Sequence, residues 1–266
     1  MKIAVLTWYD NNISEYGNIY LEINKLYCAQ HDYDLIKTNR RFYKDKPATW
    51  ERFPHLLNFI EKYDYVVWID ADAFFYYSAP PLEEIINRYQ KDILLSADAD
   101  TYLVPDSVNA GVFVLKNTKK VISLLNKWAF DEELANRFLN EKAPETQYWI
   151  EDQAMIRGCL KYNVDDMQSI TKVLPYMELQ HFNLCEFPIL KRHNILPYVF
   201  HAAGRGSSFR YYISKTYLQE ILKNPFSPFV CDKLEDKPIL DLHHRQYPRR
   251  SDLDQDLAQA QAQAQE

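Results

Sequence analysis

Glycine is scarce in this sequence, at only 5 of 266 residues. Neither a G-x-G-x-x-G nor a G-x-x-x-x-G-K-[ST] pattern occurs, so the two glycine-rich loops that commonly cradle nucleotide phosphates are absent. The four cysteines are scattered without C-x-x-C spacing, which argues against zinc and thiol-redox motifs. If the protein handles a nucleotide, it must hold the phosphates by other means.

Long apolar runs and long basic runs are also missing. No segment approaches the roughly 20 apolar residues that cross a bilayer, and the N-terminus lacks a basic region followed by an apolar stretch. The formal net charge is −6, which disfavours a nucleic-acid partner. These absences indicate a chain without a transmembrane segment or a nucleic-acid-binding surface.

Aromatic residues are abundant instead, at 15% of a chain that is 47% apolar and 26% charged. This composition is typical of a folded globular protein. No linker-like segment divides residues 1–225, so we interpret them as one domain. Residues 226–266 form a C-terminal extension, and its low-complexity tail, from about residue 251, is expected to be disordered.

Short apolar runs alternate with segments of helical periodicity along most of the chain. The pattern predicts strands over residues 2–7, 33–37, 65–69, 93–95 and 111–115, and helices over residues 19–31, 49–60, 119–138 and 152–160. Another helix is expected after the proline pair at residues 80–81, and Thr49 is expected to cap its helix. This alternation favours an α/β fold with a Rossmann-like, mostly parallel central sheet flanked by helices.

Two carboxylates directly follow the third predicted strand, in the tripeptide Asp70-Ala71-Asp72. Open α/β sheets bind ligands at the carboxyl ends of their strands. Paired carboxylates there can hold a hard divalent cation, which commonly keeps substrate phosphates as further ligands. The same tripeptide recurs at Asp98-Ala99-Asp100, where we interpret it as a solvated loop or a supporting group. The apolar strand before Asp70 is therefore what makes the first copy the candidate metal site.

Further motifs follow one another in a defined order. They are Asn24-Lys25-x-Tyr27-Cys28-x-x-His31-x-Tyr33-Asp34, Trp50-x-Arg52-x-Pro54, Trp68-Ile69-Asp70-Ala71-Asp72-Ala73, Asn109-Ala110-Gly111-Val112-Phe113-Val114-Leu115-Lys116-Asn117, Asp152-Gln153 and His201-x-x-Gly204. In order and spacing, these blocks resemble glycosyltransferase family 34. That family includes α-galactosyltransferases, xyloglucan xylosyltransferases and fungal α-1,6-mannosyltransferase subunits.

The resemblance implies a single GT-A domain and a metal-dependent, retaining glycosyltransferase. Such an enzyme moves a hexose or pentose from a nucleotide-diphosphate sugar, here expected to be a UDP-sugar, to a hydroxyl of a glycan acceptor. It implies a metal site formed by Asp70, Asp72 and His201. Because imidazole suits Mn²⁺ better than Mg²⁺, Mn²⁺ is the expected cofactor and Mg²⁺ the alternative.

The donor-binding residues follow from the same motifs and from the end of the first strand. They are expected to be Thr7, Asp10, Arg52, Asp70, Asn109, Ala110, Gly111, Gly204 and Arg205. The family places a basic residue shortly after its His-x-x-Gly motif to neutralise the diphosphate. Here Arg205 is preferred for this role over Arg210. Arg52 stands where the family has lysine, and unlike lysine it can form bidentate pairs with phosphate.

Asp152 and Gln153 are the expected catalytic residues, at the start of a helix that faces the sugar. In a retaining enzyme, a carboxylate there can act as the nucleophile or stabilise an oxocarbenium-like centre. Sequence does not choose between these roles. A purely structural alternative is that Asp152 caps its helix.

Two other functions compete with glycosyl transfer. One is a phosphohydrolase that uses the first Asp of the strand-end pair as nucleophile; the other is a non-catalytic, sugar-binding GT-A module. Family members are mostly Golgi enzymes with an N-terminal membrane anchor, whereas this sequence begins at its first predicted strand. We therefore expect a cytoplasmic protein of bacterial or viral origin, or a Golgi-lumenal one if the sequence belongs to a longer chain.

Overall fold

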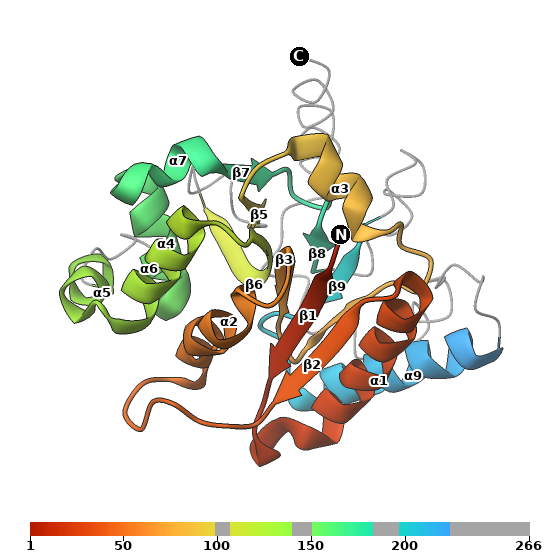
Figure 1. Ribbon diagram of the computed structural model, residues 1–266. Coiled ribbons are helices and arrows are strands. Elements are labelled where there is room, and N and C mark those ends of the chain that lie inside the picture. The colour runs from red at the N-terminus through yellow and green to blue at the C-terminus, as the bar shows by residue number, and fades with distance from the viewer. Residues whose placement is uncertain (99–106, 140–150, 183–196, 224–266) are drawn as a thin grey trace, which may run out of the picture.

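A six-stranded sheet runs through the centre of the structure in the order β2-β1-β3-β6-β5-β7 (Figure 1). The computed structural model describes residues 1–98, 107–139, 151–182 and 197–223; the predicted C-terminal extension lies outside them. In chain order, the strands of this sheet are β1 (Ile3–Trp8), β2 (Asp34–Thr38), β3 (Tyr65–Ile69), β5 (Ile93–Ala97), β6 (Val108–Lys116) and β7 (Thr171–Leu174). Neighbouring strands are parallel except at β6, which is antiparallel to both β3 and β5. The predicted mostly parallel sheet is confirmed.

Helices cover both faces of the sheet (Figure 1). The helices are α1 (Ser14–His31), α2 (Arg52–Ile60), α3 (Leu82–Tyr89), α4 (Lys119–Phe130), α5 (Glu132–Leu139), α6 (Glu151–Lys161), α7 (Met167–Ile170) and α9 (Ser207–Lys223). Short 3₁₀ turns lie at η1 (Asn11–Ile13), η2 (Ala48–Glu51) and η3 (Val164–Asp166). The α/β architecture expected from the alternating pattern is therefore present.

The alternation of side chains along each strand creates two hydrophobic layers. On β1, Val5 packs into the layer shared with α1, α3 and α9. Its neighbour Leu6 packs into the opposite layer, shared with α2, α4 and α6. Both side chains are almost fully buried. The nearly continuous apolar run in β1 and β3 thus reflects burial on both faces of the sheet.

A second, three-stranded sheet in the order β4-β9-β8 was not expected from the sequence. Its strands are β4 (Ala73–Phe75), β8 (Gln180–His181) and β9 (Val199–His201). β9 is antiparallel to β4, with Ala73 opposite His201. This pairing brings the end of β9 beside the tripeptide that follows β3.

Two predicted helices need correction, and one helix was missed. Thr49 is not a helix cap, because it lies inside η2, and α2 begins only at Arg52. The helix predicted over residues 119–138 is two helices, separated at Asp131, whose backbone is extended. Helix α9 was not predicted at all, because its apolar side chains do not fall on one clear stripe.

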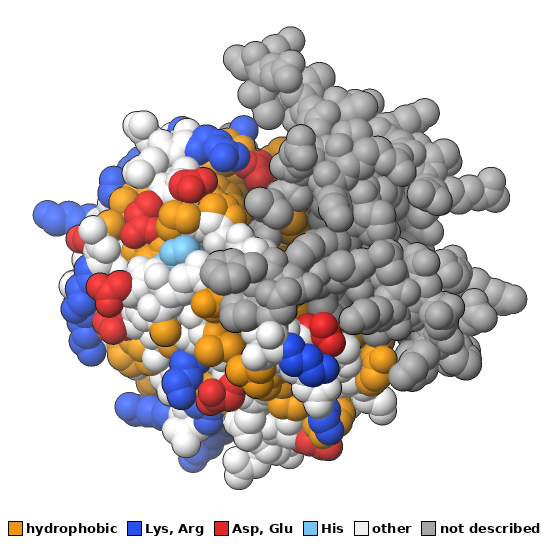
Figure 2. Space-filling model, turned by 90° about the vertical axis from the view of Figure 1, so that its right-hand side faces the viewer, with side chains coloured by type: hydrophobic (Ala, Val, Ile, Leu, Met, Phe, Trp, Pro, Cys, Tyr) orange, Lys and Arg blue, Asp and Glu red, His pale blue; other side chains and the backbone are white. Residues whose placement is uncertain are grey.

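No helix among the described residues is both long enough and apolar enough to span a membrane. On the face shown in Figure 2, basic and acidic side chains lie among apolar and uncharged ones.

Candidate active site

The Asp70-Ala71-Asp72 tripeptide forms the turn between β3 and β4. The backbone N–H of Asp70 donates to the carbonyl of Gly111 on β6 (2.8 Å), and the N–H of Ala73 donates back to the Asp70 carbonyl (3.0 Å). The carbonyl of Asp72 accepts from the N–H of Ala202, which follows β9 (2.9 Å). Backbone hydrogen bonds to β6 and to the residue after β9 therefore fix the turn that carries both carboxylates.

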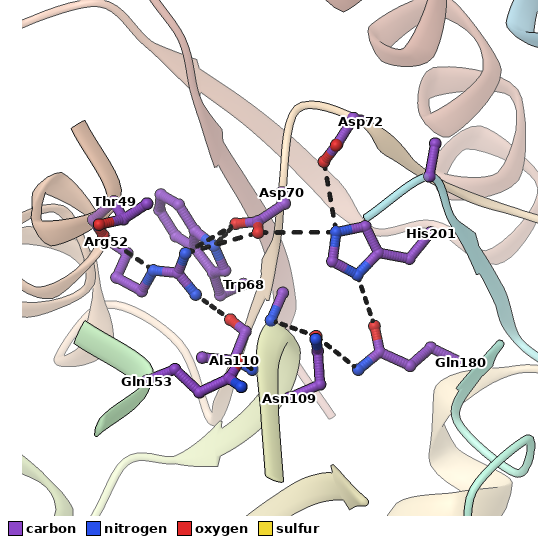
Figure 3. Close-up of polar contacts among 12 residues, drawn as sticks. Thr49, Arg52, Trp68, Asp70, Asp72, Asn109, Ala110, Gln153, Gln180 and His201 are labelled. Carbon is purple, nitrogen blue, oxygen red and sulfur yellow. Dashed lines mark hydrogen bonds and ion pairs between the residues drawn. The ribbon is translucent and has the colours of Figure 1, made fainter. Parts of the chain in front are cut away.

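Asp70, Asp72 and His201 form a compact group of candidate metal ligands (Figure 3). One ligand atom from each lies within 4.8 Å of the others. Nε2 of His201 is 3.3 Å from Oδ1 of Asp72 and 3.8 Å from Oδ2 of Asp70. Two carboxylates and an imidazole are a suitable donor set for a divalent transition metal such as Mn²⁺. The three residues proposed from the sequence as metal ligands are thus close enough together to share one ion.

The charges of this group reinforce one another. Burial alone would raise the pKa of Asp72, but His201 and Arg210 outweigh burial and lower it to about 2. Burial would likewise lower the pKa of His201, whereas the carboxylates of Asp72 and Asp70 raise it above its ordinary value. Asp72 and His201 thus each favour the charged form of the other.

Arg52 lies between the candidate metal ligands and Asp152, the predicted catalytic carboxylate. Its guanidinium forms an ion pair with Asp70 (3.2 Å) and another with Asp152 (2.8 Å), and it donates to the carbonyls of Ala110 and Thr49. The Arg52 side chain is only 4% exposed. Figure 3 shows the guanidinium between Thr49, Asp70 and Ala110. Arg52 thus contacts protein groups on several sides.

Asp152 is a fully buried carboxylate on the first turn of α6. Burial raises its pKa, Arg52 opposes that shift, and Asp70 adds to it. An acidic residue on a helical first turn also benefits from the positive end of the helix dipole. The side chain nevertheless forms an ion pair with Arg52 on another helix, so a helix cap alone does not account for its contacts.

Gln153 connects α6 to two other parts of the sheet edge. Its Oε1 accepts from the N–H of Ala110 (2.9 Å), and its Nε2 donates to Oδ2 of Asp98 (3.0 Å). Asp98 thus contacts a predicted site residue, whereas Asp100 lies outside the described residues. Both ends of the Gln153 amide are held by the protein.

An open cavity of about 290 Å³ lies over these groups. Most of the predicted site residues line it: Arg52, Asp70, Asp72, Asn109, Ala110, Gly111, Asp152, Gln153, His201 and Gly204. Gly204 has a backbone φ of +68°, a conformation that favours glycine. Sequence-distant motifs thus meet around one cavity.

Three predicted donor-binding residues do not line this cavity. Thr7 lies within β1, opposite Lys37 of β2, and is nearly buried. Asp10 caps η1 by accepting from the backbone N–H of Asn12 (2.9 Å). The guanidinium of Arg205 lies over the ring of Phe209, 5.5 Å from its centre.

Arg210 does line the cavity. In the sequence, Arg205 was preferred over it as the residue that neutralises the diphosphate. Arg210 lies on the first turn of α9, and its Nη2 is 2.7 Å from Oδ2 of Asp72. Its Nη1 donates to the hydroxyl of Tyr16 (3.3 Å), another cavity residue. The aromatic side chains of Trp8 and Trp68 also contribute to the wall. Sequence reasoning could have preferred Arg210 only by recognising α9, which places this residue beside Asp72.

Among the solved structures with a similar fold are two glycosyltransferases. One is a glycosyltransferase involved in the glycosylation of the major capsid of PBCV-1, with a TM-score of 0.54, 13% identity, and coverage of 81% of this chain and 100% of that chain. Another is the galactosyltransferase LgtC in complex with donor and acceptor sugar analogues, with a TM-score of 0.51, 11% identity, and coverage of 85% and 98%. At these identities the likeness shows the fold, and it confirms the expected GT-A architecture.

None of the curated proteins matches the chain significantly. A family model, in contrast, does match the sequence. The model described as nucleotide-diphospho-sugar transferase matches residues 21–204, which contain most of the cavity residues discussed above. The chain therefore belongs to the nucleotide-diphospho-sugar transferase family and is a glycosyltransferase.

Proposed function

We propose that this glycosyltransferase is metal-dependent and retaining, and that it moves a hexose or pentose from a UDP-sugar to a glycan hydroxyl. The observation that carries the proposal is the grouping of Asp70, Asp72 and His201, within 4.8 Å of one another, at the wall of an open cavity. A divalent cation bound there, Mn²⁺ in preference to Mg²⁺, would stabilise the negative charge that develops on the diphosphate leaving group.

Arg210 is proposed to assist in binding the donor diphosphate. It lines the same cavity, and it already neutralises one carboxylate oxygen of Asp72. The guanidinium of an arginine can donate two parallel N–H bonds to phosphate oxygens, so its geometry suits a diphosphate. Its position in the cavity makes it a better candidate for this role than Arg205.

Asp152 is proposed to face the sugar and to stabilise positive charge at its anomeric carbon. Its ion pair with Arg52 favours the ionised form against the effect of burial, and the residue lines the cavity. Attack by the carboxylate itself is the alternative mechanism, and either mechanism is compatible with retention. Gln153 is proposed to support this centre by holding the backbone of Ala110.

A donor screen tests the proposal. The protein is incubated with Mn²⁺ and, in separate reactions, with UDP-galactose, UDP-glucose, UDP-xylose, UDP-N-acetylglucosamine or GDP-mannose, and the released nucleoside diphosphate is measured. We expect release from a UDP-sugar, its loss with EDTA, and its loss in Asp72→Asn but not in the control Asp92→Asn, which changes a half-buried aspartate outside the cavity. Equal turnover in EDTA would contradict metal dependence.

The same reactions separate the competing functions. A phosphohydrolase would release inorganic phosphate from phosphate esters, and a non-catalytic module would bind the sugar nucleotide without releasing its nucleotide. Once a donor is found, the anomeric configuration of the freshly formed product, read by NMR, tests retention. An inverted product would exclude the role proposed for Asp152 in a retaining mechanism.

A further inference from the structure

A buried chain of amide groups leads from β6 to the candidate metal ligand on β9 (Figure 3). The backbone N–H of Gly111 donates to Oδ1 of Asn109 (2.8 Å), and Nε2 of Gln180 donates to the same oxygen (3.0 Å). Oε1 of Gln180 then faces Nδ1 of His201 (3.1 Å). Asn109, Gln180 and His201 are all buried, and Gln180 is completely so. Sequence analysis did not identify Gln180 as part of the site.

The hydrogen bonds along this series of amide groups can run in only one donor-to-acceptor direction. A backbone N–H can only donate, so the Asn109 atom that meets Gly111 must be its oxygen. That oxygen also meets Gln180, and therefore the Gln180 atom facing it must be the amide nitrogen. The amide oxygen of Gln180 is then turned toward His201. Because an amide oxygen can only accept, Nδ1 of His201 must carry the hydrogen.

This direction decides which nitrogen of His201 is available to a metal ion. In a neutral imidazole, one ring nitrogen carries hydrogen and the other has a free lone pair. With hydrogen on Nδ1, the lone pair is on Nε2, the atom that lies 3.3 Å from Asp72 and 3.8 Å from Asp70. The opposite tautomer would direct an N–H at the carboxylates and present no lone pair there.

We infer that Gln180 is a positioning residue that holds His201 in the Nδ1–H tautomer and thereby presents Nε2 as a metal ligand. Hydrogen bonds to the second ring nitrogen commonly orient metal-binding histidines and strengthen metal binding. The neutral amide of Gln180 does this without adding another negative charge near Asp70 and Asp72. The inference rests on the proposed metal-dependent function.

Two substitutions of Gln180 distinguish hydrogen bonding from packing. Gln180→Met keeps the length and burial of the side chain but cannot accept from Nδ1. Gln180→Glu keeps an acceptor for Nδ1 but loses the N–H that donates to Asn109. The matched control is Gln168→Met, which makes the same change at an exposed residue on α7, where Nε2 donates to the Leu160 carbonyl. Thermal unfolding of each metal-free protein reports whether it is folded.

The first measurement is the tautomer of His201 in metal-free protein, read from ¹⁵N chemical shifts of its ring at a pH above its titration. We expect Nδ1–H in the wild type, in Gln180→Glu and in Gln168→Met, and a shift toward Nε2–H in Gln180→Met. An Nε2–H tautomer in the wild type would overturn the inference, and this observation requires no variant to fold.

The second measurement is the dissociation constant for Mn²⁺, from the EPR signal of the free ion. We expect it to rise at least about tenfold in Gln180→Met, and to stay within a factor of about three of the wild-type value in Gln180→Glu and Gln168→Met. An unchanged Mn²⁺ affinity in Gln180→Met would overturn the inference. A wild-type protein with the Nδ1–H tautomer that binds no Mn²⁺ would instead contradict the proposed function.

Discussion

The imidazole of His201 lies so close to the backbone of Gly111 that no side chain fits between them. A Cβ atom built at position 111 would overlap Cε1 of the ring and lie 2.5 Å from Nδ1. In the sequence, Gly111 was predicted as a donor-binding residue. The structure gives the reason for a glycine at this position: the missing side chain makes room for the candidate metal ligand.

Gly111→Ala is therefore expected to displace His201 and to weaken Mn²⁺ binding at least about tenfold, because the ligand can no longer occupy its position. Donor turnover should fall with it. Gly206→Ala is the matched control, since a Cβ there meets no atom within 4 Å. Metal titrations of both variants check the prediction, and unchanged Mn²⁺ affinity in Gly111→Ala would contradict it.

Removing the charge of Arg52 should destabilise the fold. Arg52→Met leaves the fully buried Asp152 without its ion-pair partner, and breaking a buried pair in this way costs about 3–5 kcal/mol. Arg52→Met combined with Asp152→Asn should recover most of that loss, because no uncompensated charge remains. Urea unfolding of the single and double variants measures both effects. A double variant no more stable than Arg52→Met would show that the ion pair is not the cause.

Arg210 and Arg205 should differ in their effect on the donor. Arg210→Ala is expected to raise the donor KM about tenfold, as the loss of one charged hydrogen bond would, whereas Arg205→Ala should change it little. Mn²⁺ affinity should not fall in Arg210→Ala, since a cation that competes for Asp72 is removed. Initial rates over a range of donor concentrations decide between the two arginines. The opposite ranking would restore Arg205 as the diphosphate ligand.

Acid should destabilise the protein through His55. Burial lowers the pKa of this histidine from 6.5 to about 4, so the unfolded chain takes up a proton at a higher pH than the folded one. The free energy of unfolding should therefore decrease by about 3 kcal/mol as the pH falls from 6.5 to 4. His55→Gln should show a shallower decrease over this range. Identical pH profiles for the two proteins, from urea unfolding, would refute the assignment to His55.

The sequence was most informative where a local pattern determines the structure. Strand β3 has the predicted bounds, because an apolar run that ends in Asp70 needs no distant partner to be recognised. His201 was placed beside Asp72 through a family motif, and the spacing of the two residues does not by itself imply their contact. The short strands β4 and β9 that create this contact are too brief to show a period.

Residues that act through tertiary contacts escaped sequence analysis. Gln180 lies on a strand of two residues, and its role depends on Asn109 and His201, which come from two other strands. Arg52 was recognised as part of a motif, but its contacts with Asp70 and Asp152 could not be read from the chain. A buried cation with several protein partners leaves no linear signal.

The two hydrophobic layers have a consequence for how the protein responds to its ligands. Asp72 and Arg210 are attached to the layer that contains α9, whereas Arg52 and Asp152 extend from helices of the opposite layer. A ligand that contacts both groups would favour the state in which both layers are folded. Amide hydrogen exchange should then slow together in α6 and α9 when donor and metal bind, so the cavity joins the two halves of the core into one cooperative unit.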